Sequence, residues 1–230
     1  SSPGKSDSAV NMAKRGALIV LEGLDRSGKT TQAARLVEAL NSRGFSAVNM
    51  SFPDRTTPIG TVIDTYLKSG NELDDAAVHL LFSANRWEAS KAMKEKLQSG
   101  TSIVLDRYAF SGVAFTAAKG TLSIDWCKGP DRGLPKPDVV IYLNVSPEVA
   151  KQRGGYGGER YENPEFQEKV RENFDTLRFE DGGLWEMVDA DRSADEVASI
   201  VSEIACQKAA QVQLMPLADN LWEQPAGGMA

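Results

Sequence analysis

The sequence predicts an α/β fold with a doubly wound, mostly parallel sheet of five strands. Short apolar runs alternate with longer segments of helical periodicity along the 230 residues, which is typical of strands joined by crossover helices. A glycine-rich segment separates the first apolar run from the first helical segment, which predicts a tight strand-to-helix turn. No repeat and no linker divides the chain, so we expect a single core.

The expected strands are short runs of aliphatic and β-branched residues. The run from Ala17 to Glu22 is apolar up to its last residue, the pattern of a strand buried on both faces. Pro53 ends the second run, because proline cannot extend a ladder of hydrogen bonds. The five expected strands are residues 17–22, 47–52, 101–105, 138–145 and 186–189.

The expected helices carry apolar residues at spacings of three and four. Gly44 is expected to end the first, Ser146 and Pro147 to open another, and Ser193 with Glu196 to form a capping box. The remaining bounds are residues 28–40, 59–67, 74–98 and 164–179. Candidate core residues in the longest helix are Ala77, Leu80, Leu81, Ala84, Trp87 and Met93, and we interpret Trp87 and Trp126 as core anchors.

Three segments differ in composition from the core, which we place at residues 16–215. Residues 1–15 are polar and lack the apolar core of a signal peptide, which indicates a flexible tail or an expression remnant. Residues 153–162 are too glycine-rich to pack as a regular element and carry Arg153 and Arg160, so we expect a mobile lid. Residues 216–230 form a tail to which the sequence assigns no function.

Composition excludes several classes of function. The formal net charge of −6 argues against general binding of nucleic acid or of a membrane surface. Two cysteines, Cys127 and Cys206, and a single histidine, His79, favour neither a disulfide framework nor a zinc site. We interpret His79 as structural or as part of a subunit contact. No run approaches transmembrane length, so we expect a protein of a reducing, cytosolic-type setting.

The glycine-rich segment from Gly23 to Thr30 reads Gly-Leu-Asp-Arg-Ser-Gly-Lys-Thr and matches the pattern G-x-x-x-x-G-K-[ST] at every fixed position. In this pattern backbone N–H groups surround phosphates, the lysine contacts the β- and γ-phosphates, and the hydroxyl ligates Mg²⁺. Here these residues are Lys29 and Thr30. The strand before the segment and the helix after it supply the required context. The chain is therefore expected to bind a nucleoside triphosphate.

Five arginines stand after expected strands, in this loop or in the glycine-rich lid. They are Arg26, Arg55, Arg107, Arg153 and Arg160. A cation about 4 Å from a phosphate is worth roughly 4 kcal/mol at an effective dielectric constant near 20, before desolvation. An acidic protein that transfers a phosphoryl group must concentrate such cations in one cleft. Arg26 occupies a variable loop position, from which it could contact the transferred group as an arginine finger supplied in cis.

Together these segments resemble the thymidylate kinases of the P-loop nucleoside-monophosphate kinase group, closest to the eukaryotic type. The resemblance spans roughly residues 16–190. It rests on the loop with Asp25-Arg26, on Phe52-Pro53-Asp54-Arg55, on residues 79–87, on Asp106-Arg107-Tyr108 with Ser111-Gly112, and on the lid. It implies ATP-dependent phosphorylation of dTMP to dTDP for dTTP synthesis, with in-line transfer and Mg²⁺. It also implies a homodimer, with residues 74–98 as the plausible interface, and a cytoplasmic location that leaves room for a nuclear pool.

The resemblance assigns roles in dTMP binding residue by residue. Asp25 would accept a hydrogen bond from the 3′-hydroxyl, and Arg55 and Arg107 would hold the monophosphate. Phe82 would stack on thymine and Arg86 would bind the carbonyl O4. The rest of the pocket would be lined by Phe52, Leu67, Ser111, Gly112, Phe115, Tyr161 and Gln167, with Tyr161 against the sugar face that lacks a 2′-hydroxyl.

The resemblance assigns the ATP side in the same way. Asp106 would support the magnesium shell through water, beside Thr30. Adenine would lie against Arg153 and residues 190–192. The ATP-binding residues would be Gly23, Arg26, Ser27, Gly28, Lys29, Thr30, Thr31, Arg153 and Arg192, and the catalytic residues Arg26, Lys29, Asp106, Arg107 and Arg153.

Other interpretations stay open at this point. A related P-loop kinase could act on another monophosphate or on a deoxynucleoside, although Phe82 and Arg86, one helical turn apart, favour a pyrimidine with a carbonyl at position four. A GTPase-type switch should carry Asn-Lys-x-Asp after a late strand, where this chain has Leu143-Asn144-Val145-Ser146. A P-loop protein without chemistry would not need Arg26. Without the resemblance, Phe82 would be assigned to the core, and Leu67 and Phe115 could be packing alone.

Overall fold

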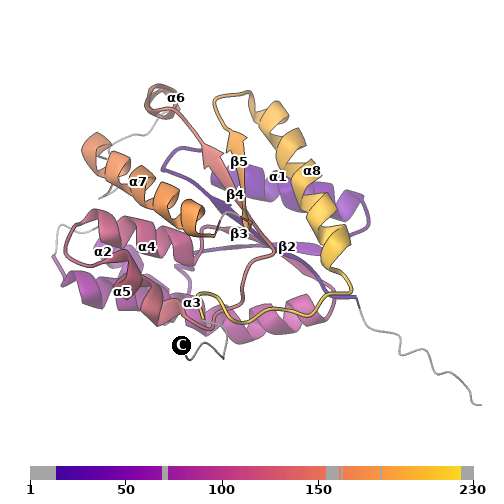
Figure 1. The fold of residues 1–230 in the computed structure, drawn as a ribbon, viewed down its shortest axis with the longest axis horizontal. Helices are drawn as coiled ribbons and strands as arrows, with labels where there is room; N and C mark the ends of the chain where they lie inside the picture. Colours follow the sequence, from indigo (N-terminus) through magenta and orange to yellow (C-terminus); the bar gives the residue numbers. More distant parts are fainter. Residues whose placement is uncertain (1–13, 69–71, 154–160, 162, 182, 224–230) are drawn as a thin grey trace, which may run out of the picture.

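The central sheet has five parallel strands in the order β2-β3-β1-β4-β5 (Figure 1). The computed structural model describes residues 14–68, 72–153, 161, 163–181 and 183–223. The strands are β1 Leu18–Glu22, β2 Ala47–Ser51, β3 Ser102–Asp106, β4 Val139–Asn144 and β5 Trp185–Asp189. The predicted α/β fold with a parallel five-stranded sheet is confirmed.

Helices cover both faces of this sheet (Figure 1). They are α1 Lys29–Ser42, α2 Pro58–Lys68, α3 Asp75–Gln98, α4 Ala109–Ala118, α5 Ile124–Lys128, the 3₁₀ turn η1 Gly129–Asp131, α6 Pro147–Gln152, α7 Pro164–Glu180 and α8 Ala194–Val212. The capping box of Ser193 and Glu196 opens α8 as predicted. The helices α4 and α5 and the turn η1 were not predicted.

The side chains of β1 alternate between two hydrophobic clusters, one on each face of the sheet. Leu18 and Val20 join a cluster built with α3, α4 and α7, while Ile19 and Leu21 join a cluster built with α1 and α8. All five residues of β1 are buried. A strand buried on both faces needs no polar alternation, which is why its sequence is a continuous apolar run.

The buried face of α3 is mostly polar, which corrects the predicted core positions of this helix. Of those positions Met93 is fully buried, whereas Ala77, Leu80 and Trp87 are exposed and Leu81 and Ala84 are half-buried. Trp126, the other predicted core anchor, is 39% exposed. Besides Val78, Met93 and Leu97, the side chains that α3 buries are polar: His79, Ser83, Asn85, Arg86 and Ser90. Hydrophobic periodicity could not find this face, because its buried groups are satisfied by hydrogen bonds rather than by apolar contact.

His79 illustrates this packing. Its side chain is fully buried, with Nδ1 2.8 Å from Thr116 Oγ1 and Nε2 2.8 Å from the carbonyl oxygen of Cys127. Burial and the nearby charge of Arg86 hold the pKa of His79 below its ordinary value. The residue therefore ties α3 to α4 and α5 as a neutral structural group.

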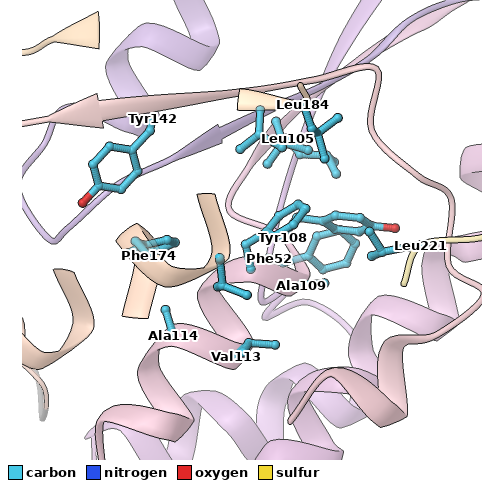
Figure 2. Close-up of a cluster of buried hydrophobic side chains, with 14 of the residues drawn as sticks. Phe52, Leu105, Tyr108, Ala109, Val113, Ala114, Tyr142, Phe174, Leu184 and Leu221 are labelled. Atoms are coloured by element: carbon cyan, nitrogen blue, oxygen red, sulfur yellow. The ribbon is translucent and has the colours of Figure 1, made fainter. Parts of the chain in front are cut away.

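Both predicted tails overlap the folded core. Arg15 is buried and forms an ion pair with Asp138 at 2.8 Å, so the core extends to at least this residue. At the other end Leu221 is fully buried in the cluster under α4, where Figure 2 shows it with Phe52 and Tyr108. Residues 216–223 therefore pack against the core through Leu217, Leu221 and Trp222. Residues 1–13 and 224–230, and residues 154–160 and 162 of the expected lid, lie outside the described part of the chain.

Candidate active site

The loop between β1 and α1 has a backbone that only particular residues tolerate. Gly23 has φ 148°, and a Cβ added there would lie 2.7 Å from the carbonyl oxygen of Leu143. Gly28 has φ 94° and precedes α1, whose N-terminus no side chain caps among the described residues. Arg26 has φ 66°, which is uncommon for a residue other than glycine. The loop therefore presents backbone N–H groups at a helix N-terminus, where an anion can bind.

Lys29 lies beneath this loop. Its ammonium group donates to the carbonyl oxygens of Gly23 at 3.1 Å and Leu24 at 2.7 Å and to Ser27 Oγ at 3.2 Å. Burial and the neighbouring charge of Arg107 lower the pKa of Lys29 to about 8. Lys29 is therefore a buried cation whose three donors are held by weak neutral acceptors, which phosphate oxygens can replace.

We expect ATP binding to weaken as the pH rises above about 8, because Lys29 then loses its proton in the free protein. Binding would require proton uptake, and the Kd should rise toward tenfold per pH unit. Unfolded lysine keeps its proton to about pH 10.4, so the same group makes the free energy of unfolding increase between these two pH values. Calorimetric titration from pH 7 to 9.5 measures the Kd directly.

The matched variant for this titration is Lys29→Arg, whose guanidinium stays charged throughout. Its affinity for ATP should be lower overall and independent of pH. A pH-independent Kd in the unmodified protein would contradict the role of Lys29.

Thr30 and Asp106 bring two oxygen donors together where α1 begins and β3 ends. Thr30 Oγ1 donates to Asp106 Oδ2 at 2.6 Å. A hydroxyl and a carboxylate are hard oxygen ligands of the kind that Mg²⁺ takes, and Mg²⁺ commonly uses one or two such protein groups together with substrate phosphates. The residues present therefore fit a magnesium ion.

Arg107 links the loop to the neighbouring strand end. Its guanidinium donates to the Gly23 carbonyl oxygen at 3.3 Å and to Ser111 Oγ at 3.1 Å, and forms an ion pair with Asp25. Like Arg26 it has a positive φ, 68°. Burial alone would lower the pKa of Arg107, but Asp25 and Glu22 outweigh it and keep the group charged. Backbone strain of this kind gathers at functional sites, and of the three described non-glycine residues with positive φ, Arg26, Arg107 and Trp222, two are arginines that the sequence singled out.

Asp25 is held by partners from two other elements. Gln167 Nε2 donates to its carboxylate at 2.7 Å, and Arg107 donates to the other oxygen. Burial would raise the pKa of Asp25, but the charges of Arg107 and Lys29 outweigh it and hold the pKa below its ordinary value. Asp25 is therefore an ionised acceptor with fixed orientation.

Glu22 is a site residue that sequence reasoning missed. It is fully buried and accepts from the backbone N–H groups of Tyr108 at 2.9 Å and Ser111 at 3.0 Å and from Ser111 Oγ at 2.5 Å. It thereby caps the N-terminus of α4 and holds Ser111 against Arg107. The sequence signal that could have identified Glu22 is an acid at the end of an otherwise apolar strand. A carboxylate buried there needs hydrogen-bond partners, which indicates a site built around it.

A cavity of about 750 Å³, including the part open to solvent, lies beside the loop. Its wall includes eleven of the residues assigned to dTMP: Asp25, Phe52, Arg55, Leu67, Phe82, Arg86, Arg107, Ser111, Gly112, Phe115 and Tyr161. The twelfth, Gln167, contacts Asp25 from outside the cavity wall. Five further lining residues were not anticipated: Pro53, Val78, Tyr108, Thr116 and Lys119.

Lys119 adds a cation to the far wall of the cavity. It donates to Asp75 at 2.8 Å and lies 5.4 Å from the ring centroid of Tyr161. Burial would lower the pKa of Lys119, but Asp75 and Tyr161 outweigh it and raise the pKa above its ordinary value. Tyr161 also shares a 3.0 Å hydrogen bond with Tyr66 of α2, so this wall joins four separate segments.

The two other arginines of the cavity differ in their surroundings. Arg86 is 2% exposed and paired with the fully buried Asp131, whereas the Arg55 side chain is 38% exposed and paired with Asp64 at 2.8 Å. Arg55 therefore lies at the rim, where a phosphate can compete with Asp64 in water. Arg86 belongs to the inner wall.

Arg153 connects the loop to the segment that follows β5. Its guanidinium donates to the Arg26 carbonyl oxygen at 3.2 Å and to the carbonyl oxygen of Ala190. Arg192 forms an ion pair with Asp189 at 3.3 Å instead. Thr31 is exposed on the first turn of α1. Arg160 lies outside the described residues.

Comparison with known proteins decides the family. The thymidylate kinase family model matches residues 21–201. The thymidylate kinases of Danio rerio and Homo sapiens are each 50% identical over 214 residues, covering 93% and 92% of this chain and 97% and 99% of those proteins. The solved structure of thymidylate kinase from Candida albicans superposes with a TM-score of 0.77 at 42% identity, covering 84% of this chain and 92% of that one. The chain belongs to the thymidylate kinase family.

Membership of the thymidylate kinase family settles the reaction class. The chain is a phosphotransferase that uses ATP to convert dTMP to dTDP on the route to dTTP. The interpretations as a GTPase-type switch and as a P-loop protein without chemistry are therefore wrong. No helix of the described residues has the length and apolar character needed to cross a membrane.

Proposed function

We propose that dTMP binds in the cavity beside the loop and that ATP lies with its phosphates on the loop, so that the two nucleotides meet end to end. One observation carries this proposal: Asp25 belongs to the loop and also lines the cavity, where it pairs with Arg107. The acceptor phosphate and the transferred phosphate would then share the cations at this junction. Such positioning is most of what phosphoryl transfer requires of a protein.

Within the cavity, thymine would stack on the half-buried Phe82 and direct its O4 to Arg86. Asp25, an ionised acceptor, suits a hydrogen bond from the 3′-hydroxyl. Arg55 at the rim and Arg107 at the junction would hold the monophosphate. The remaining wall would enclose the sugar and exclude water: Phe52, Leu67, Ser111, Gly112, Phe115 and Tyr161, with Gln167 supporting Asp25.

On the loop, the β- and γ-phosphates of ATP would replace the neutral acceptors of Lys29. Gly23, Ser27, Gly28, Thr30 and Thr31 would surround the phosphates from the N-terminus of α1. The adenine would lie against Arg153, which contacts Ala190, and near Arg192.

Arg26 would contact the transferred group, and Arg153 would hold the loop in place through the Arg26 carbonyl oxygen. Thr30 would ligate Mg²⁺ and Asp106 would bind its water shell. When bound, Mg²⁺ supplies charge neutralisation on the phosphate oxygens.

The test of the substrate is a coupled assay of ADP release over dTMP, dUMP, dCMP, AMP and GMP. We expect dTMP to give the highest kcat/KM, because dCMP would present an amino group to the donors of Arg86. A higher kcat/KM for another monophosphate would reject this arrangement of the cavity, in which Arg86 reads the carbonyl O4.

We expect Phe82→Ala to raise the KM for dTMP by about fivefold to 150-fold, because stacking of a base on an aromatic ring is worth about 1–3 kcal/mol. The KM for ATP should not change. Steady-state kinetics with each substrate varied in turn measures both constants. The exposed aromatic Phe179 provides the matched control, since Phe179 does not line the cavity. Unaltered constants for dTMP in Phe82→Ala would reject stacking.

We also propose a homodimer, formed through the exposed face of α3, and a cytoplasmic location. Leu80 and Trp87, 49% and 41% exposed, stand seven residues apart and hence on one side of this helix. Light scattering after gel filtration measures the mass in solution, and Leu80→Asp should shift it toward the monomer. A monomeric mass for the unmodified protein at micromolar concentration would reject the dimer.

A further inference from the structure

Asp131 is a fully buried acid outside the cavity wall. It ends the turn η1, in the segment that connects α5 to β4. Its carboxylate accepts from Arg86 Nε at 3.0 Å and Arg86 Nη2 at 2.6 Å, and from Ser83 Oγ at 2.8 Å. Two parallel bonds from one guanidinium to one carboxylate fix the plane of the guanidinium as well as its position.

Arg86 is also restrained from the opposite side. A Cβ added to Gly112 of α4 would lie 2.8 Å from Arg86 Nη2 and 3.1 Å from Nη1, so the guanidinium packs directly on the backbone of α4. Nη1 makes no hydrogen bond to any residue that the structure describes. Arg86 is nevertheless 2% exposed and contributes to the cavity wall. A buried, charged donor with spare capacity at a cavity is prepared for an acceptor on a ligand.

The position of Asp131 is itself supported by the C-terminal segment, which runs back across the molecule after α8 (Figure 1). Gly133 N donates to the Leu221 carbonyl oxygen at 3.1 Å, and Leu221 N donates to the Leu134 carbonyl oxygen at 3.1 Å. Lys136 N donates to the Ala218 carbonyl oxygen at 2.8 Å. These backbone hydrogen bonds anchor residues 133–136, which follow Asp131 in the chain, to the C-terminal segment. None of the residues that they join lines the dTMP cavity.

We propose that Asp131 is a positioning residue for base selection: by clamping Nε and Nη2 of Arg86 against Gly112, it aims Nη1 at the carbonyl at position four of the pyrimidine. This inference rests on the proposed function, in which Arg86 reads O4. A guanidinium that is free to rotate could turn away from the cytosine amino group and accept dCMP. The clamped one cannot, so the selectivity depends on Asp131 as well as on Arg86.

The experiment compares kcat and KM for dTMP and dCMP in full-length Asp131→Asn and Asp125→Asn. Asn at position 131 keeps one acceptor for Arg86 but turns an amide N–H₂ toward the other nitrogen, so the bidentate bond is lost. We expect the KM for dTMP to rise about tenfold or more and the ratio of kcat/KM for dTMP to that for dCMP to fall about tenfold, with the KM for ATP unchanged. Asp125 precedes Asp131 by six residues and pairs with Arg132 on the surface. Asp125→Asn should therefore have the kcat and KM values of the unmodified protein.

Two further variants keep the proposal falsifiable. Ser83→Ala removes one of the three hydrogen bonds to Asp131 and serves as the test if Asp131→Asn does not fold. It should also lower the ratio of kcat/KM for dTMP to that for dCMP, but by less than Asp131→Asn. An unchanged ratio in folded Asp131→Asn overturns the proposal. If only Ser83→Ala folds, an unchanged ratio in that variant overturns it. A lowered Tm without a change in the ratio overturns it as well, because Asp131 would then have only a structural role.

Arg86→Lys separates the inference from the function beneath it. If Arg86→Lys lowers the ratio of kcat/KM for dTMP to that for dCMP and Asp131→Asn does not, the proposed function stands and the role of Asp131 is rejected. If Arg86→Lys leaves the ratio unchanged, base reading by Arg86 fails and the inference fails with it.

Discussion

Arg26→Ala is expected to lower kcat by about three orders of magnitude, the effect of removing an arginine that stabilises the transferred phosphoryl group. The KM for dTMP should change by less than about threefold, because an interaction made only in the transition state does not contribute to ground-state binding. Arg26 lies in the loop with φ 66°, a conformation that costs about 1–3 kcal/mol and that glycine would adopt without strain. An arginine kept at such a position is best explained by its guanidinium.

The control for this prediction is Arg26→Gly, which removes the same side chain and relieves the backbone. If the guanidinium acts on the phosphoryl group, both variants lose kcat equally and Arg26→Gly is at least as stable to heat as Arg26→Ala. A near-normal kcat in either variant, measured at saturating ATP and dTMP, would reject the finger in the loop. Arg153→Ala, measured alongside, shows how much of the remaining rate depends on the contact of Arg153 with the loop.

The strands and the loop could be predicted because their signals are local. β1 and β4 are continuous apolar runs, and every fixed position of the loop motif lies within eight residues of sequence. The predicted bounds of the strands agree with the structure to within one or two residues, as expected for elements defined by pattern. The fold class follows from these elements and from the handedness of their crossovers.

What the sequence could not reveal depends on pairs distant along the chain. Arg86 meets Asp131 across 45 residues, and Glu22 meets Ser111 across 89. Neither acid belongs to a motif, so only the folded backbone identifies it as a partner. Helix α4 was missed for a related reason: its residues Ala109–Ala118 are buried almost all round, and a helix without a polar face has no periodicity to detect.

The site residues show both outcomes within one helix. Phe82 and Arg86 were placed together because four residues span one helical turn, and they do line one cavity. Leu80 and Trp87 were placed in the core because they are apolar, and they are exposed. The spacing of residues predicts which side chains share a face of a helix. Their polarity does not predict which face is buried when the buried side chains are polar and form hydrogen bonds.

Arg107→Met is expected to lower kcat/KM for dTMP by about three orders of magnitude, because a cation near a phosphate is worth about 4 kcal/mol at an effective dielectric constant of 20. Both kcat and KM should worsen, since the acceptor phosphate is bound before transfer and carries charge during it. Steady-state kinetics with dTMP varied gives the two constants. Arg35→Met provides the matched control, because Arg35 pairs with Asp195 on the surface between α1 and α8.

The same variant should also be less stable, by an argument that does not involve substrate. Arg107 is the cation that holds Asp25 and that opposes the burial of Glu22. A carboxylate whose folded pKa is depressed contributes stability above its unfolded pKa and loses it as the pH falls. Without Arg107 the depression at Asp25 should diminish and the pKa of Glu22 should rise further, so the Tm of Arg107→Met should fall most relative to the unmodified protein near neutral pH and least in mild acid.

Arg107→Lys distinguishes charge from geometry in both effects. Lysine keeps the positive charge, but its compact ammonium cannot reach Asp25, Ser111 and the Gly23 carbonyl oxygen in the fixed fork that a guanidinium provides. Most of the Tm should therefore return, while kcat/KM for dTMP should remain about tenfold to a hundredfold low, in keeping with the loss of one or two charge-assisted bonds. Full recovery of kcat/KM in Arg107→Lys would mean that the strained backbone at this position does not serve to orient the guanidinium. A normal Tm in Arg107→Met would mean that other groups hold Asp25 and Glu22.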